Sequence, residues 1–161
     1  MNWKSLYNMQ EQLDQYIKDN HQLTSDELFE KKILALFVEL GELANETRCF
    51  KFWSLKDPSP RETILEEYVD GIHFILSLGL DAGFEVEEVK HQPFKGELTD
   101  LFNQLYRAID YYRDDRSIET YLTVFGLFLT LGSELGFTDK EVQTAYIDKN
   151  EENFKRQDEQ Y

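Results

Sequence analysis

Two acidic pairs in the chain have a spacing that could serve chemistry. Glu39 and Glu42 lie three residues apart in KKILALFVELGELANET, and Glu67 and Asp70 lie three apart in EEYVDGIHF. Residues three apart on a helix share nearly the same face. The apolar residues around both pairs have helical spacing, and 24 residues separate Glu42 from Glu67. Helices joined by a short connection pack antiparallel, so we expect the four carboxylates to meet across their interface.

Four carboxylates at close range repel one another, and bound cations relieve this repulsion. Hard divalent ions with oxygen ligands, magnesium above all, suit such a set. A di-iron carboxylate bundle is the alternative, but it uses Glu-x-x-His on two helices. Here only Asp70 and His73 have a comparable spacing, while His21 and His91 fall in predicted loops. The two pairs together therefore predict a magnesium site, whereas the pair of Glu39 and Glu42 taken alone is more typical of a solvated helix flank.

One face of the last predicted helix changes from apolar to cationic along its length. The stripe that begins at Val142 continues at helical spacing into Lys149, Asn153 and Arg156. Lysine supplies a point charge, and arginine supplies a fork of donors for phosphate oxygens. The pattern indicates an anion clamp, and a frayed polar helix end is the alternative.

The segment CFKFWS, residues 49–54, follows the first acidic pair. Its aromatic residues are typical of core packing at a helix end, and stacking of Trp53 on a base is the alternative. His73 lies one turn beyond Asp70. It is therefore either a helix histidine with its partners inside the protein or a side chain of the same cleft.

Nearly every segment that carries these residues predicts a helix. The first helix follows from the apolar spacing of Leu6 to Ile17, and the fourth begins near Leu98. The sequences TSDE, SPRE and TDKE are capping boxes that predict the starts of the second, third and last helices. The third is expected to end near Gly79 or Gly83, and the fifth, which begins near Ser117, to be the most buried. The prediction is an all-α bundle of about six helices, mostly antiparallel neighbours, in a single domain over residues 1–161.

Composition excludes several partner classes. With 17 basic and 32 acidic residues the net charge is −15, which disfavours nucleic acid and anionic membranes. The single cysteine, Cys49, forms no internal disulfide. No signal-peptide core follows the N-terminus, and the longest apolar stretch is too short for a membrane span. We expect a soluble, cytoplasmic protein.

The motifs together resemble the all-α nucleoside triphosphate pyrophosphatases, the MazG-like superfamily, with its E-x2-E and E-x2-D signature. FKFW, DGIHF and KNEENFKRQ follow in the order found in the dimeric dUTPases, and the resemblance covers essentially the whole chain. It implies a hydrolase of nucleotide metabolism, a homodimer, that converts dUTP to dUMP and pyrophosphate with Mg2+. Two positions depart from the family pattern: Asp14 stands where asparagine is also common, and Gln160 precedes the last tyrosine in place of glycine.

The resemblance also implies roles for individual residues. Glu39, Glu42, Glu67 and Asp70 would hold the metal, and Glu42, with Glu39 as the other candidate, would orient or deprotonate the attacking water. The remaining site positions fall into a phosphate group and a nucleoside group. The phosphate group is Lys149, Asn153, Arg156 and Tyr161, and the nucleoside group is Gln10, Asp14, Trp53 and His73.

Two alternatives to this function stay open from the sequence. A related pyrophosphatase acting on dCTP or on several nucleotides would share the same metal site. A non-catalytic acidic helical protein would use its surface to bind another protein, and its carboxylate pairs would be solvated.

Overall fold

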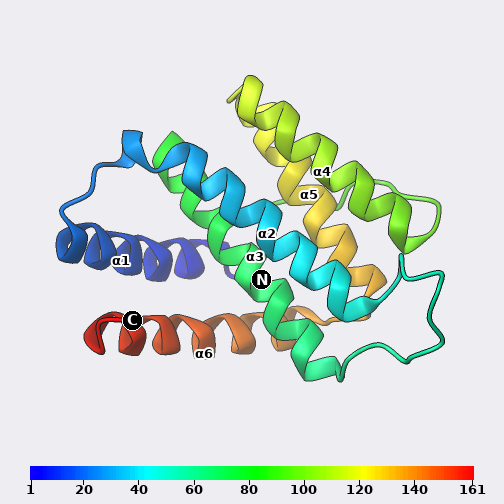
Figure 1. The fold of residues 1–161 in the computed structure, drawn as a ribbon. Helices are drawn as coiled ribbons and strands as arrows, with labels where there is room; N and C mark the ends of the chain where they lie inside the picture. Colours follow the sequence, from blue (N-terminus) through cyan, green and yellow to red (C-terminus); the bar gives the residue numbers. More distant parts are fainter.

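The computed structural model describes residues 1–161 as an all-helical protein, which confirms the predicted fold class (Figure 1). The helices and the single 3-10 turn, η1, follow one another without a strand. Their bounds are α1 Trp3–His21, η1 Ser25–Glu27, α2 Phe29–Thr47, α3 Arg61–Ala82, α4 Leu98–Asp114, α5 Ile118–Glu134 and α6 Asp139–Asp158.

The helices α2 and α3 form the antiparallel pair that the acidic motifs predicted. Lys32 near the start of α2 contacts Asp81 near the end of α3, and Glu46 near the end of α2 bonds Ser59 just before α3. Apolar positions of both helices are fully buried between these ends, Leu36 and Leu40 on α2 and Ile72 on α3 among them. The shared core fixes the register that decides which polar residues face each other.

The helices α4 and α5 form a second antiparallel pair, joined at Ser117, which caps α5 (Figure 1). As expected, α5 is the most buried helix: its apolar run from Tyr121 to Leu131 is almost entirely enclosed. It packs closely enough on α3 that the ring of Phe128 covers the backbone of Gly71. The centre of the bundle is therefore built on α3 and α5.

The first and last helices, α1 and α6, lie side by side and run parallel (Figure 1). Met1 contacts Asp139 at the start of α6, while His21 bonds Gln157 near its end. This pairing departs from the mostly antiparallel arrangement expected from short loops. It arises because α1 and α6 are far apart in the chain and are not constrained by a connecting loop.

Two predicted helix starts need correction. The box at Thr24 caps the 3-10 turn η1, and α2 begins after it at Phe29. The capping box predicted at Ser59 is wrong. Pro60 is the N-cap residue of α3, and no side chain caps this helix, because the Ser59 hydroxyl donates a hydrogen bond to Glu46 instead. The start of α5 at Ser117 and the capping box at Thr138 are as predicted, and α3 ends one residue before Gly83.

No single helix is long and apolar enough to cross a membrane; α5 and α6 taken together meet the length and composition test, but they meet at a bend of 110°.

Candidate active site

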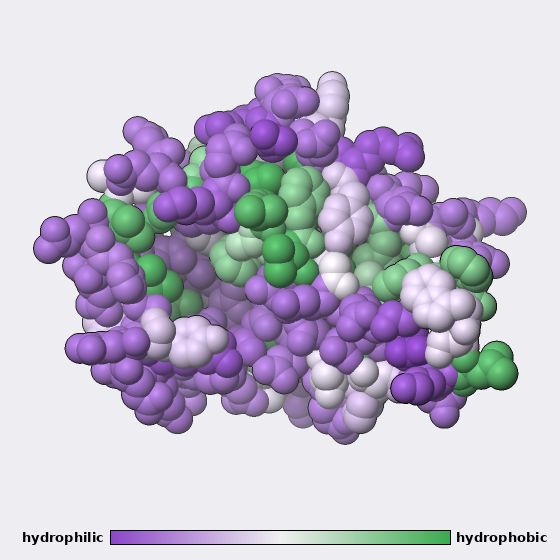
Figure 2. All heavy atoms as spheres, in the orientation of Figure 1, coloured by the Kyte–Doolittle hydropathy of each residue, from purple (hydrophilic) through white to green (hydrophobic).

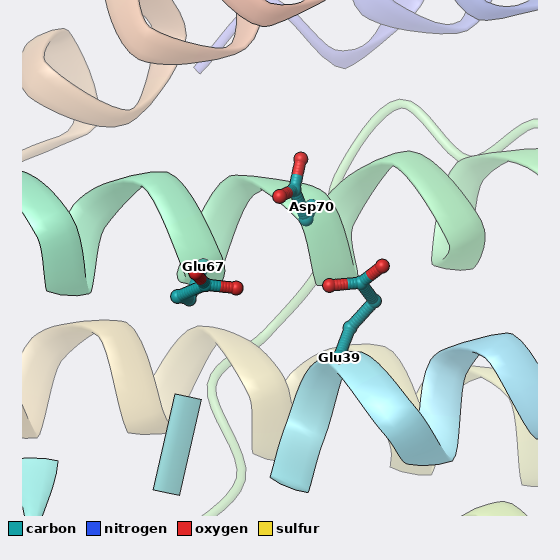
Figure 3. Close-up of side chains that lie close together, drawn as sticks. All are labelled: Glu39, Glu67 and Asp70. Atoms are coloured by element: carbon teal, nitrogen blue, oxygen red, sulfur yellow. The ribbon is translucent and has the colours of Figure 1, made fainter. Parts of the chain in front are cut away.

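Three of the four predicted metal-ligand carboxylates lie together between α2 and α3. Glu39 projects from α2, and Glu67 and Asp70 project from successive turns of α3 (Figure 3). One oxygen atom of each lies within 4.8 Å of the others, which is close enough to share a cation. The Glu39 Oε2 atom is buried without a hydrogen-bond partner. The cluster thus leaves a carboxylate oxygen that no protein group satisfies.

Burial and mutual repulsion raise the pKa of all three carboxyls. The pKa of Glu39 rises to about 8, first through burial and then through the charges of Asp70, Glu42 and Glu67. Burial and the charges of Asp70 and Glu42 raise the pKa of Glu67 to about 7. Burial raises the pKa of Asp70 to about 6, although Lys149 acts in the opposite direction. A group of neighbouring carboxyls with raised pKa values is typical of a functional site.

The fourth carboxylate, Glu42, lies at the exposed edge of the cluster. It is exposed on α2 and lines a shallow groove with Glu67 and Glu46. Its charge contributes to the raised pKa of both Glu39 and Glu67. The structure therefore brings three of the four carboxylates together as the spacing predicted, and Glu42 lies outside this group on the solvent side.

The cations predicted on α6 lie against this cluster. The buried Lys149 ammonium lies 3.3 Å from Asp70 Oδ2 and donates to Glu66 at 2.8 Å. Arg156 donates to Glu152 at 2.6 Å, one turn back on the same helix. Carboxylates hold both cations in place. A phosphate chain would displace these carboxylates, and a metal ion would neutralise them.

A cavity of about 360 Å³ opens beside the cluster, enclosed by α1, α2, α3 and α6. It is visible as the hollow between α1 and α2 in Figure 2. Glu39 and Asp70 line it together with Lys149, Asn153 and Arg156. Beyond them its wall is formed by α1, by the segment between α1 and α2 and by Lys32 of α2, with apolar side chains such as Leu13 and Leu28. The cavity thus has a charged end and a more apolar end, as a nucleotide requires.

A chain of hydrogen bonds orients the polar residues of the cavity wall. The Gln10 amide oxygen accepts from Tyr146 at 2.7 Å and lies 2.7 Å from His73 Nδ1, and its nitrogen donates to Asp14 at 2.8 Å. The Ser77 hydroxyl donates to the other Asp14 oxygen at 2.7 Å. Burial lowers the pKa of His73 to about 3, so the ring is neutral. With Nδ1 donating to Gln10, the buried Nε2 is an acceptor without a partner.

Four residues of the predicted site do not line this cavity: Glu42 and Glu67, which line the shallow groove beside the cluster, and Trp53 and Tyr161, which lie apart from both. Trp53 is 64% exposed in the connection between α2 and α3, where it packs edge-on against Phe50 and Phe52. Tyr161 is 85% exposed, and its ring lies beneath the Arg156 guanidinium at 5.1 Å. Within one chain, neither residue lines the cavity wall.

Sequence reasoning missed Lys32, Ser77 and Asn150. Lys32 and Ser77 line the cavity, and the buried Asn150 side chain ties α6 to α1 through the Met9 carbonyl. Spacing could have found the first two. Lys32 lies seven residues before Glu39 and Ser77 seven after Asp70, which places each of them two turns along the same helix face.

The fold and the site define an all-α protein in which a carboxylate cluster lies beside a cavity. A family model described as dUTPase matches residues 2–161, and the chain belongs to this all-α dUTPase family. No match was found among curated proteins. Membership confirms the resemblance drawn from the motifs. It makes the protein an enzyme of nucleotide metabolism that hydrolyses dUTP and excludes the non-catalytic alternative.

Proposed function

We propose that the protein hydrolyses dUTP to dUMP and pyrophosphate and depends on magnesium. The observation that carries this proposal is the cluster of Glu39, Glu67 and Asp70, whose oxygens lie within 4.8 Å of one another at the charged end of the cavity. Family membership supports the substrate, and the cluster supports the metal requirement.

The residues present fit magnesium. All the donors of the cluster are carboxylate oxygens, the ligands that this hard cation prefers. The raised pKa values of Glu39 and Glu67 and the orphaned Glu39 Oε2 atom indicate a site that is incomplete without positive charge. Glu39, Glu42, Glu67 and Asp70 would hold the ions. When bound, magnesium supplies positive charge against the phosphate oxygens and makes a water molecule easier to deprotonate.

Glu42 would receive the proton of the attacking water. It lies at the solvent edge of the cluster, so water reaches its carboxylate without crossing the core. The water oxygen forms a bond to the phosphorus nearest the sugar, the bond from that phosphorus to the bridging oxygen breaks, and pyrophosphate leaves. The proton of the water passes to a Glu42 carboxylate oxygen. Glu39 is the alternative acceptor, because its carboxylate lies in the same cluster and lines the cavity.

The cations of α6 would bind the phosphate chain. Lys149 and Arg156 line the charged end of the cavity with Asn153 between them. Their positive charge is available where the leaving pyrophosphate develops negative charge. Tyr161 stacks on Arg156 and would fix the guanidinium for this contact.

The polar wall formed by α1 and α3 would hold the nucleoside. Gln10 and Asp14 are already oriented by hydrogen bonds, and His73 Nε2 is free to accept from a nucleoside donor. Trp53 would stack on the base only after a movement of its loop or through a neighbouring subunit, since it is exposed in the single chain.

We further propose a homodimer. Leu34 and Val38 are 63% and 49% exposed, one turn apart on the outer face of α2, and Figure 2 shows apolar side chains gathered on this side of the molecule. Phe52 and Leu55 in the following loop are exposed almost completely. A second copy would cover this apolar surface. Sedimentation equilibrium should give twice the chain mass, and Leu34→Glu should shift the protein towards the monomer; a wild-type monomer at micromolar concentration would contradict the proposal.

The deciding experiment measures pyrophosphate release from dUTP, dCTP, dTTP, dATP, dGTP and UTP, with magnesium and with chelator. We expect release from dUTP that chelator abolishes. Release from several nucleotides would keep the metal site and replace uracil specificity by a broad range. Undiminished release with chelator would contradict the metal requirement.

A further inference from the structure

The more apolar end of the cavity contains a buried ammonium group, that of Lys32. Lys32 precedes Glu39 by seven residues on α2, and Ser77 follows Asp70 by seven on α3. Because α2 and α3 are antiparallel, seven residues back along α2 and seven residues forward along α3 lead in the same direction. At ~1.5 Å per residue, Lys32 and Ser77 lie about 10 Å beyond the carboxylates. Lys32 is therefore about two helical turns from the place where the phosphates are expected.

The Lys32 ammonium has donors to spare. The residue is 9% exposed, its Nζ pairs with Asp81, and it lies 4.0 Å from Asp14 Oδ2. Asp81 is shared with Lys18, 3.5 Å away, so its charge is already compensated by a second cation. An ammonium has three N–H donors, and Asp81 is the one hydrogen-bond acceptor that the protein gives Nζ. Buried ion pairs contribute little to stability, so a purely structural role explains this arrangement poorly.

The surroundings of Lys32 suit a pyrimidine ring. Leucine and isoleucine side chains from α1 and from the segment that leads into α2 line the same end of the cavity, Leu13, Ile17 and Leu28 among them. Ligand sites combine such apolar walls with a few placed polar groups. The polar groups here are a donor, the Lys32 ammonium, and a neighbouring acceptor, the Asp14 carboxylate. Burial raises the pKa of Asp14, while the charge of Lys32 and the hydrogen bonds from Ser77 and Gln10 act in the opposite direction.

We propose that Lys32 is the residue that selects uracil, through a hydrogen bond from its ammonium to the O4 carbonyl of the base, beside Asp14, which accepts from N3–H. The inference rests on the proposed function, because it takes this cavity as the nucleotide site. Uracil presents an acceptor at O4, whereas cytosine presents an amino donor at that position. Cytosine would thus set a donor against a donor-only ammonium and an unprotonated ring nitrogen against a carboxylate. Unmatched buried polar groups of this kind give strong discrimination.

The test compares kcat/KM for dUTP and dCTP in Lys32→Met, Lys32→Gln and the wild-type enzyme, with magnesium present. In Lys32→Met the loss of a charged hydrogen bond should lower the dUTP value roughly 10- to 100-fold and the dCTP value much less. In Lys32→Gln the amide oxygen can accept from the cytosine amino group, so the dCTP value should rise. Lys31→Met is the matched control: it removes the same charge from an exposed neighbouring position of α2 and should leave both values unchanged.

Each outcome decides the inference. Equal losses for both nucleotides in Lys32→Met and Lys32→Gln would overturn it and leave Lys32 a structural residue. A wild-type enzyme that hydrolyses dUTP and dCTP equally well would also overturn it while preserving the proposed function, whereas no hydrolysis of either would defeat the proposed function itself. If Lys32→Met does not fold, Lys32→Met/Asp81→Asn removes the lysine together with its partner charge. The same fall in the dUTP to dCTP ratio is expected from it, and an unchanged ratio would contradict the inference.

Discussion

The Glu67 carboxyl has no cation partner, and like charges surround it. Both features oppose the stability of the folded protein. Burial, Asp70 and Glu42 all act against ionisation there, which is why the pKa of Glu67 rises to about 7. The same repulsion provides the affinity for a divalent ion, because binding the ion relieves it. Function and stability therefore oppose each other at this residue.

We predict that Glu67→Gln abolishes activity without weakening the metal-free fold. The amide keeps the shape of the side chain, removes one ligand charge and relieves the repulsion on Glu39. Activity should fall by ~100-fold or more, while the urea midpoint measured in chelator stays the same or rises. Glu62→Gln on the exposed first turn of α3 is the control and should change neither quantity. Retained activity in Glu67→Gln would show that the carboxylate cluster is not the site.

The positions of the acidic residues could be predicted because helical spacing and one short connection determine them. Glu39 and Asp70 follow from periodicity alone once α2 and α3 are paired. The position of Trp53 could not, since no periodicity constrains residues 48–60, which form an irregular connection. Lys32 was missed for a different reason: beside Lys31 in KKIL it has the appearance of a solvated charge, and only its spacing from Glu39 distinguishes it.

At the scale of the helices, capping motifs predicted starts well where the cap had no competitor. The structure has a capping box at Ser117, where the sequence predicted only a helix start, and another at Thr138, where the sequence predicted the box itself. Ser59 has the same local sequence pattern, but its hydroxyl bonds Glu46 from α2, so a tertiary contact overrides the local motif. The parallel pairing of α1 with α6 was likewise beyond local reasoning, because it joins the two ends of the chain.

The contact between α3 and α5 depends on Gly71, which permits an approach that no other residue would. A Cβ atom there would lie 2.4 Å from Phe128 Cζ, and Phe128 is fully buried and stacked on Tyr68 at 4.7 Å between ring centroids. We predict that Gly71→Ala lowers the free energy of unfolding by about 1–3 kcal/mol, the usual cost of overpacking. Urea titration of the metal-free protein measures this.

Gly41→Ala on α2 is the control for this substitution. Its Cβ would meet only the Tyr106 hydroxyl, at 3.1 Å, the far end of a side chain that is not fully buried. Alanine's higher helix propensity should then leave stability unchanged or higher by up to ~1 kcal/mol. If Gly71→Ala were as stable as Gly41→Ala, the close packing of α3 on α5 would not limit stability.

For the whole molecule, the net charge of −15 and the site together indicate a protein that binds its anionic substrate only when cations are present. Long-range repulsion by the acidic surface opposes the approach of a triphosphate. Lys149 and Arg156 alone do not reverse it, since both are paired with carboxylates in this state. We therefore predict that the proposed metal requirement extends beyond the chemical step to the binding of the nucleotide itself.

The stability of the metal-free protein should consequently fall as the pH rises from 6.5 to 8. The pKa values of Glu39 and Glu67, about 8 and about 7, lie above their ordinary value of 4.5, so in this range the folded state binds more protons than the unfolded state. Under that condition the free energy of unfolding decreases with pH. The lowered pKa of His73 has the opposite effect, but only below its ordinary value of 6.5, which sets the lower limit of the range.

Thermal unfolding in chelator should thus show a midpoint that declines across the range, less steeply in Glu67→Gln. Magnesium should restore it most at pH 8, where metal and protons compete least for the carboxylates. A midpoint in chelator that is flat or rises from pH 6.5 to 8 would mean that these carboxyls ionise without cost, and the cluster would then have no need of a cation.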